Sequence, residues 1–364
     1  MNAQATWDLL QNTFADWSED KAPRLAAALA YYTVFAIAPI LVIAIAVAKM
    51  FGFSGAQAEI IGQVSGVVGQ QAGEAIRTMV ENRGQSNSTN ILATIVGLVT
   101  LFIAATGLFG ELQDSLNTIW EVQPKPNQGI AATLKNRFFS FTMVLGVGFL
   151  LLVSLVISTI LSALGSTFGG PPESQTIVWK AINFIISFGV TTLLFALIYK
   201  VIPDVKIAWS DVWMGALVTA VLFTVGKFLI ARYLANESTA SSYGAAGALV
   251  LVLIWVYYSA QILFLGAEFT QVYAKAYGSK IQPAENAVPI TADARAEQGI
   301  PRKEQVEGAA LMEREVGGTT LSGPTDGSPE QAHAAEHQEQ PKAGAGAMTA
   351  FFLGLLLGRR QRSK

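Results

Sequence analysis

Five polar residues stand out because they lie beside or within long apolar segments. Glu111, Asp114 and Asn117 follow one such segment at intervals of three, a spacing that places them on roughly one face of a helix. Glu268 is bracketed by apolar residues, and Lys227 lies inside another apolar segment. Ionisable groups at membrane depth are costly and mark ion or substrate pathways. The five residues therefore predict a polar cluster able to relay protons or contact a polar substrate.

Basic residues near the same predicted depth could bind an anionic headgroup. A structural alternative is that charged residues at the helix ends form ion pairs in the headgroup layer, and that Lys227 extends its ammonium to the outer surface. This alternative applies to Lys200, Lys206, Asp204 and Asp211, and less to Glu111 and Glu268. The candidate cations are Lys135, Arg137, Lys200 and Lys206, and the nearby carboxylates are Asp204 and Asp211.

Other chemistries find little support. The only two histidines, His333 and His337, lie in a polar segment, and the chain has no cysteine. The phosphate-binding pattern G-x-x-x-x-G-K-[ST] is absent, and the net charge of −2 disfavours a nucleic-acid partner. We therefore expect no metal, no cofactor and no enzymatic activity.

The elements that position these residues follow from the composition. The 364 residues are 52% hydrophobic and 14% charged, against roughly 25% charged in a soluble domain. Six apolar runs approach or exceed the roughly 20 residues that cross a bilayer. The chain is thus predicted to be all-α, a bundle of six transmembrane helices with membrane lipids as partners. The predicted spans are 25–48, 91–110, 141–164, 181–202, 212–233 and 247–272.

Lysine and arginine near the span ends predict the orientation. Nine lie on one side and five on the other, and cytoplasmic loops retain the positive charge. Both termini are therefore expected in the cytoplasm. Pro39 lies near the middle of the first span, where a proline kinks a helix.

Two flanking segments are predicted to be amphipathic helices. Residues 1–24 place Trp7, Leu10, Phe14 and Trp17 on one face, as expected of a helix in the membrane interface. In the outer loop, apolar residues recur at helical spacing between Ile60 and Met79. That helix is expected to pack over the outer mouth of the bundle, with partner binding as the alternative.

The C-terminal part of the chain has a different composition. Of the 24 basic and 26 acidic residues, 22 lie after residue 274. Residues 278–347 lack a sustained apolar period and are predicted to be a disordered cytoplasmic tail. Residues 348–364 form a short apolar and basic terminal segment, too short to span a bilayer. The sequence leaves open a cytoplasmic partner of the tail and a homo-oligomer.

Several motifs follow one another along residues 20–277, and they include Tyr31 with Tyr32, Tyr243 with Gly244, and Gly266. Taken in order, they resemble the YihY/BrkB family of bacterial inner-membrane proteins. The resemblance implies a six-helix protein of the bacterial cytoplasmic membrane, whose members carry the labels virulence factor, ribonuclease BN and transporter linked to export of lipid A precursors. A ribonuclease needs metal ligands or an acid/base pair and a basic surface, which these residues do not supply. The matching residues are Tyr31, Tyr32, Pro39, Trp120, Tyr243, Gly244, Trp255, Tyr257 and Gly266.

Two functions follow as hypotheses. The first is a transporter or flippase-like exporter of a lipidic or amphipathic substrate, in which Glu111 or Glu268 couples transport to protons. The second is a membrane scaffold without transport activity, whose cytoplasmic tail recruits partners.

Overall fold

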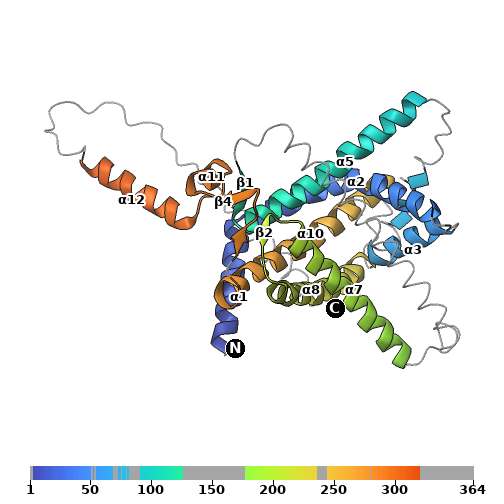
Figure 1. The fold of residues 1–364 in the computed structure, drawn as a ribbon, viewed down its shortest axis with the longest axis horizontal. Helices are drawn as coiled ribbons and strands as arrows, with labels where there is room; N and C mark the ends of the chain where they lie inside the picture. The colour runs from blue at the N-terminus through green and yellow to red at the C-terminus, as the bar shows by residue number, and fades with distance from the viewer. Residues whose placement is uncertain are drawn as a thin grey trace, which may run out of the picture. The chain divides into compact units, whose positions relative to one another are not determined.

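The computed structural model describes residues 3–50, 52, 55–68, 73–74, 76–78, 80–81, 91–125, 177–235, 244–279 and 281–319. These residues are mostly helical (Figure 1). The helices are α1 (Ala3–Glu19), α2 (Ala22–Met50), α3 (Ala56–Val68), α5 (Ile91–Ile119), α7 (Ile177–Val201), α8 (Trp209–Ala235), α10 (Gly244–Tyr277), α11 (Ala292–Glu297) and α12 (Lys303–Thr319).

Four helical segments among the described residues are long and apolar enough to cross a membrane: Ala22–Met50, Phe184–Val201, Trp209–Leu229 and Leu249–Tyr277. They coincide with four of the six predicted spans. Helix α5 contains the predicted span 91–110 and continues to Ile119, whereas the predicted span 141–164 lies outside the described residues. The count of six therefore stays a prediction.

Helices α2 and α10 lie side by side at the centre of the bundle, and α8 and α5 also pack against α10 (Figure 1). The N-terminal half of α2 and the C-terminal half of α10 share one apolar core, which includes Ala26 and Phe264. The other halves share a second core with α3, which includes Ile45, Ile60 and Trp255. The two helices are therefore antiparallel, with a separate core near each end.

The outer surfaces of α7 and α8 are apolar. Phe184, Leu217 and Phe228 are among their exposed side chains, and Phe228 is 68% exposed. Apolar exposure on this scale is typical of helices that face lipid.

Glycines allow α8 and α10 to approach closely. A Cβ atom at Gly215 of α8 would overlap the Thr270 side chain of α10, and one at Gly266 of α10 would overlap Thr219 of α8. The hydroxyl of Tyr199 joins the same junction, hydrogen bonding with Thr219 Oγ1 at 2.9 Å and donating to the Leu263 carbonyl at 2.8 Å. Small residues at such crossings allow tight helix packing in membranes.

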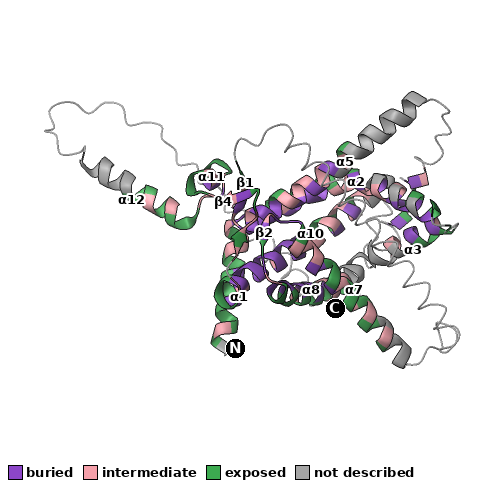
Figure 2. Ribbon diagram, viewed as in Figure 1, coloured by how far each residue is buried: buried purple, intermediate pink, exposed green. Residues whose placement is uncertain are grey.

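Helix α1 packs against α10, with Leu9 buried beside Phe269 and Val272. The opposite side of α1 presents Trp7, Leu10 and Phe14, and Trp7 is 67% exposed. Figure 2 shows exposed residues along much of α1. Trp17, expected on that exposed side, instead packs against the core. Helix α1 thus has an exposed aromatic side and a second side fixed to the bundle.

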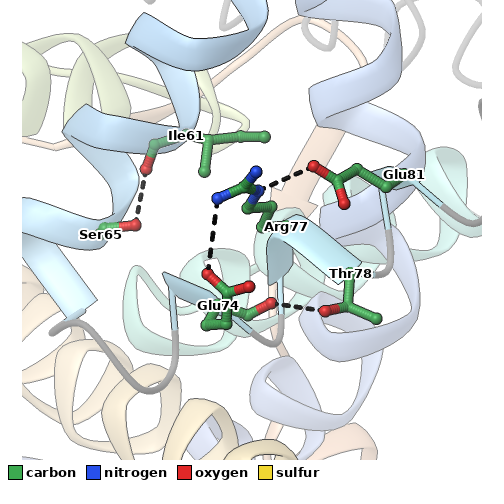
Figure 3. Close-up of polar contacts among 6 residues, drawn as sticks. All are labelled: Ile61, Ser65, Glu74, Arg77, Thr78 and Glu81. Carbon is green, nitrogen blue, oxygen red and sulfur yellow. Dashed lines mark hydrogen bonds and ion pairs between the residues drawn. The ribbon is translucent and has the colours of Figure 1, made fainter.

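The predicted amphipathic loop helix is present as α3, and helical residues between Gly73 and Glu81 follow it. Ile60, Ile76 and Val80 are buried against α2 and α10. Figure 3 shows the polar side, where Arg77 Nε donates to Glu81 at 2.7 Å and an Arg77 Nη atom lies 3.9 Å from Glu74. The apolar side covers one end of the bundle, as the periodicity predicts.

Four short strands correct the prediction of an all-α fold. β1 (Val122–Pro124) pairs with β4 (Ala287–Pro289), and β2 (Val205–Lys206) pairs with β3 (Gln282–Pro283), both antiparallel. We call these four strands the strand cap and the end of the bundle that carries them the capped end. They join the residues after α5 and α7 to the residues after α10.

The prediction of disorder over 278–347 is wrong for residues 281–319, which contain β3, β4, α11 and α12. Residues 281–289 become ordered because strands distant in sequence supply their hydrogen bonds, which an apolar period cannot reveal. Residues 320–364, including the predicted apolar and basic segment 348–364, lie outside the described residues.

The chain divides after Ile290 into two compact units. In the second unit, Thr291 accepts a hydrogen bond from the Ala294 N–H at 3.2 Å and so caps α11. Helix α12 follows from Lys303 to Thr319.

Candidate functional site

Asp204, in the connection between α7 and α8, binds three polar side chains from two other parts of the chain. Its carboxylate accepts hydrogen bonds from Gln113 at 3.1 Å and Asn117 at 2.9 Å, both on α5. It also accepts from Asn286, between β3 and β4, at 3.0 Å. The Asp204 N–H donates to Asn117 Oδ1 at 2.8 Å. The predicted cluster residue Asn117 therefore holds the capped end together through Asp204.

The other two predicted cluster residues on α5 are less enclosed. Glu111 is half-buried and Asp114 is exposed. Desolvation by surrounding protein atoms, followed by repulsion from Asp204, raises the pKa of Asp114 above its usual range. Glu111, Asp114 and Asp204 thus form an acidic group beside the strand cap.

The residues around the start of α8 are tied to the end of α10. The Asp211 carboxylate accepts hydrogen bonds from the Ser279 N–H at 2.8 Å and the Ser279 hydroxyl at 2.7 Å. The candidate cations Lys200 and Lys206 already have protein partners: Lys200 donates to the Ile207 carbonyl, and Lys206 lies 3.5 Å from Glu285. Lys206 thus forms an ion pair, but with Glu285 rather than with Asp204 or Asp211, whereas Lys200 binds a backbone carbonyl.

Glu268 has a different environment. Its side chain is fully buried in α10, and neither carboxylate oxygen has a hydrogen-bonding partner among the described residues. The charged groups that act on it are Asp20, Asp16, Lys275 and Glu121. Glu111 and Asp114 are not among them, so the predicted cluster consists of two separate groups, one around Asp204 and one around Glu268.

A pocket of about 400 Å³ opens beside the strand cap. Trp120 and Glu121, at the end of α5, and Ala274 and Lys275, near the end of α10, contribute to its lining. Lys275 Nζ and a Glu121 carboxylate oxygen lie 3.1 Å apart. The pocket therefore contains an ion pair of which both members also act on Glu268.

The structure places the remaining predicted residues as follows. Lys227 is half-buried in α8. Tyr31, Tyr32 and Tyr257 are exposed, whereas Trp120 and Trp255 are buried. Pro39 and Gly244 lie in helices α2 and α10, Gly266 lies at the close crossing, and Lys135, Arg137 and Tyr243 lie outside the described residues.

The sequence reasoning missed the residues that surround Glu268. Asp16, Asp20 and Glu121 are not among the residues of the predicted polar cluster. The spacing of seven between Glu268 and Lys275, two turns of one helix face, was the available signal. Within the described part of the chain, no group of three or more metal-binding side chains is placed to hold a metal ion.

Comparison with known families and proteins gives consistent matches. A family described as "Virulence factor BrkB" matches residues 13–291, a region that includes all four cap strands. A UPF0761 membrane protein of Halorhodospira halophila is 31% identical over 257 residues, which cover 70% of this chain and 54% of that protein. A UPF0761 membrane protein of Mannheimia succiniciproducens is 29% identical over 273 residues, which cover 71% and 87%.

A third relative, a UPF0761 membrane protein of Vibrio vulnificus, is 27% identical over 295 residues, which cover 79% of this chain and 88% of that protein. The chain spans about half the length of the Halorhodospira relative. No solved structure matches the chain.

Proposed function

This chain belongs to the Virulence factor BrkB family of multi-pass membrane proteins, and from that premise we propose that it transports a lipidic or amphipathic substrate across the bacterial cytoplasmic membrane. The proposal includes no catalytic step, cofactor or nucleic acid. Membrane lipids are the partners, and both termini lie in the cytoplasm.

One observation carries this proposal: the burial of Glu268 in a helix long and apolar enough to span the membrane. An unpartnered carboxyl group costs stability in such a place, and ionisable residues inside membrane helices mark transport pathways. A membrane scaffold that only recruits partners has no use for a buried carboxyl group that lowers its stability. The pocket lined by Glu121 and Lys275 adds a polar opening at the same end of the bundle.

The test is movement of lipid between leaflets by the full chain in vesicles. Vesicles would contain a fluorescent phosphatidylglycerol or phosphatidylethanolamine that dithionite bleaches only in the outer leaflet. We expect the unaltered protein to expose inner-leaflet lipid to dithionite and Glu268→Gln to lose most of that activity. Glu285→Gln, at a carboxylate on the exposed cap surface, is the matched control and should behave as the unaltered protein.

The outcome against transport is equally defined. If vesicles with the unaltered protein lose no more label than protein-free vesicles for either lipid, with and without a pH gradient, the proposed substrate class is wrong. If Glu268→Gln moves lipid as well as Glu285→Gln, the observation that carries the proposal has no role in transport.

The scaffold alternative makes the second unit, Thr291–Lys364, the active part. Truncation after Ile290 removes that unit and keeps the strand cap. Loss of a cellular phenotype with lipid movement retained would favour the scaffold, whereas retention of both would favour the bundle.

The proposed orientation can be tested because the chain has no cysteine. Ser18→Cys in α1 and Ser328→Cys in the tail should resist a membrane-impermeant maleimide in intact spheroplasts, whereas Ser88→Cys in the predicted outer loop should react. Labelling of the first two in intact spheroplasts would reverse the orientation.

A further inference from the structure

Helix α10 has a polar stripe that begins within its buried surface and ends at the exposed Lys275. Gln261, Glu268 and Lys275 follow one another at intervals of seven, which is close to two helical turns and places them on one face. Gln261 and Glu268 are both buried, and none of their side-chain polar atoms has a hydrogen-bonding partner among the described residues. Buried polar atoms without a protein partner commonly bind water. The stripe therefore indicates a hydrated route along α10.

The stripe leads to the pocket at the capped end. The side-chain amide of Gln271, one turn beyond Glu268, donates to the Ile119 carbonyl at 2.8 Å. The side-chain oxygen of the same amide is buried without a hydrogen-bonding partner in the described part of the chain. Lys275 then lines the pocket and pairs with Glu121. The polar side chain of Gln271 thus lies along α10 between Glu268 and the pocket that Lys275 lines.

The charges around Glu268 favour binding of a cation. Asp16 and Asp20 act on it from α1 and the turn that follows, Glu121 acts from the end of α5, and Lys275 acts from α10. The described charged residues of α2 and α8 are not among the groups that act on it. Three carboxylates and one lysine therefore act on Glu268.

The ligand chemistry distinguishes a proton from a metal ion. Calcium and magnesium ions need several oxygen ligands, commonly from carboxylates, and no group of three acidic or histidine side chains among the described residues is placed to provide them. A proton needs one carboxylate oxygen, and binding it neutralises the buried charge.

We propose that Glu268 is a proton-binding site, loaded from solvent through the pocket at Glu121 and Lys275. The carboxylate takes a proton from water to form the neutral carboxyl group and returns it to water on release. The role of this proton as the coupling ion rests on the proposed transport function. The binding of the proton at Glu268 does not.

The experiment is modification of the full chain in detergent micelles with dicyclohexylcarbodiimide. This apolar reagent reacts with a protonated carboxyl group in apolar surroundings, where the carboxyl oxygen adds to the carbodiimide carbon and the acyl group then moves to nitrogen. Mass spectrometry of peptides should find the adduct on Glu268, with less modification as the pH rises. A water-soluble carbodiimide should instead modify exposed carboxylates such as Glu285.

Four variants test whether the labelling depends on Glu268 and on the charges around it. Glu268→Gln should remove the adduct from the α10 peptide, and Glu285→Gln should leave it unchanged. Asp20→Asn removes a negative charge that acts on Glu268, so the midpoint of the labelling profile should move to lower pH. Lys275→Gln removes the positive charge that acts on Glu268, so the midpoint of the labelling profile should move to higher pH.

The proposal is overturned if the unaltered chain carries no adduct on Glu268 at any pH, or if labelling of Glu268 does not change with pH. These readouts use the unaltered chain and therefore hold even if a variant fails to fold. Labelling of Glu268 in a protein that moves no lipid would reject the proposed transport and keep the proton site. Lipid movement without labelling of Glu268 would reject the proton site and keep the proposed transport.

Discussion

Asn117 and Asn286 provide a matched pair for testing what stabilises the capped end. Both donate a side-chain hydrogen bond to Asp204, at 2.9 Å and 3.0 Å. Asn117 is buried and also accepts the Asp204 N–H at 2.8 Å, whereas Asn286 is exposed. Alanine substitution at the two positions thus removes the same type of contact from environments that differ in access to water.

The expected magnitudes follow from that difference. A hydrogen bond to a charged group contributes about 1.5–3 kcal/mol, and a neutral one about 1 kcal/mol. Asn117→Ala loses one of each and should lower the free energy of unfolding by about 2–3 kcal/mol, after a reduction because Asp204 is only half-buried. At the exposed position 286, water can replace the hydrogen bond that the Asn286 amide donates to Asp204. Asn286→Ala should therefore lower the free energy of unfolding by about 0.5 kcal/mol or less. A difference of about 2 kcal/mol corresponds to roughly a 30-fold change in the unfolding equilibrium.

The assay is unfolding of the full chain in mixed detergent micelles with increasing dodecyl sulfate, followed by tryptophan fluorescence. A double-mutant cycle of Asn117→Ala with Asp204→Ala should give a coupling energy above about 1 kcal/mol. The reasoning is refuted if Asn286→Ala costs as much as Asn117→Ala, or if the effects of Asn117→Ala and Asp204→Ala simply add.

Three further predictions use the same unfolding assay. Gly266→Ala should lower the free energy of unfolding by about 1–3 kcal/mol because side chains of α7 and α8 occupy the position of its Cβ. Gly189→Ala is the control and should be neutral or stabilising because no neighbouring atom lies within 4 Å of its Cβ. Equal effects of the two substitutions would contradict the close crossing. Because the pKa of Asp114 is raised in the folded state, the folded state loses stability as the pH rises through that pKa. Asp114→Asn should therefore stabilise the protein at neutral pH, and this gain in stability should disappear near pH 4. A gain in stability that stays constant with pH would contradict the prediction. Truncation after Ile290 should leave the free energy of unfolding nearly unchanged, whereas truncation after Tyr277 should lower it by at least about 2 kcal/mol. Equal free energies for the two truncated chains would show that the strand cap adds no stability.

The spanning helices were largely predictable because apolar length determines them. The predicted span 181–202 lies almost entirely within α7, and 212–233 lies within α8. Both helices place exposed apolar side chains on their outer surfaces, which is the pattern that hydropathy detects. The bundle therefore follows from composition alone.

The strand cap was not predictable in the same way. Its strands contain two or three residues each and pair with segments far away in the sequence. Such strands are too short to show an alternating pattern. Asn286 gave no signal either, because its role depends on the position of Asp204.

The environment of Glu268 was missed because α1 was assigned wholly to the membrane interface. The aromatic residues Trp7 and Phe14 predicted that position, and they are exposed in the structure. The side of α1 that packs on α10 includes Leu9 and Thr13, a small and partly polar set. In a membrane protein the most apolar side of a helix faces lipid, so amphipathicity does not identify the packed side.

The strand cap also sets an order on biosynthesis. The ribosome makes β1 before α7, α8 and α10, and it makes β4 only after all three. The ladder between β1 and β4 therefore cannot form until the last spanning helix has left the ribosome. Closure of the cap is consequently a late step in assembly, and it joins the connections of the bundle only in a chain that has been synthesised through Pro289.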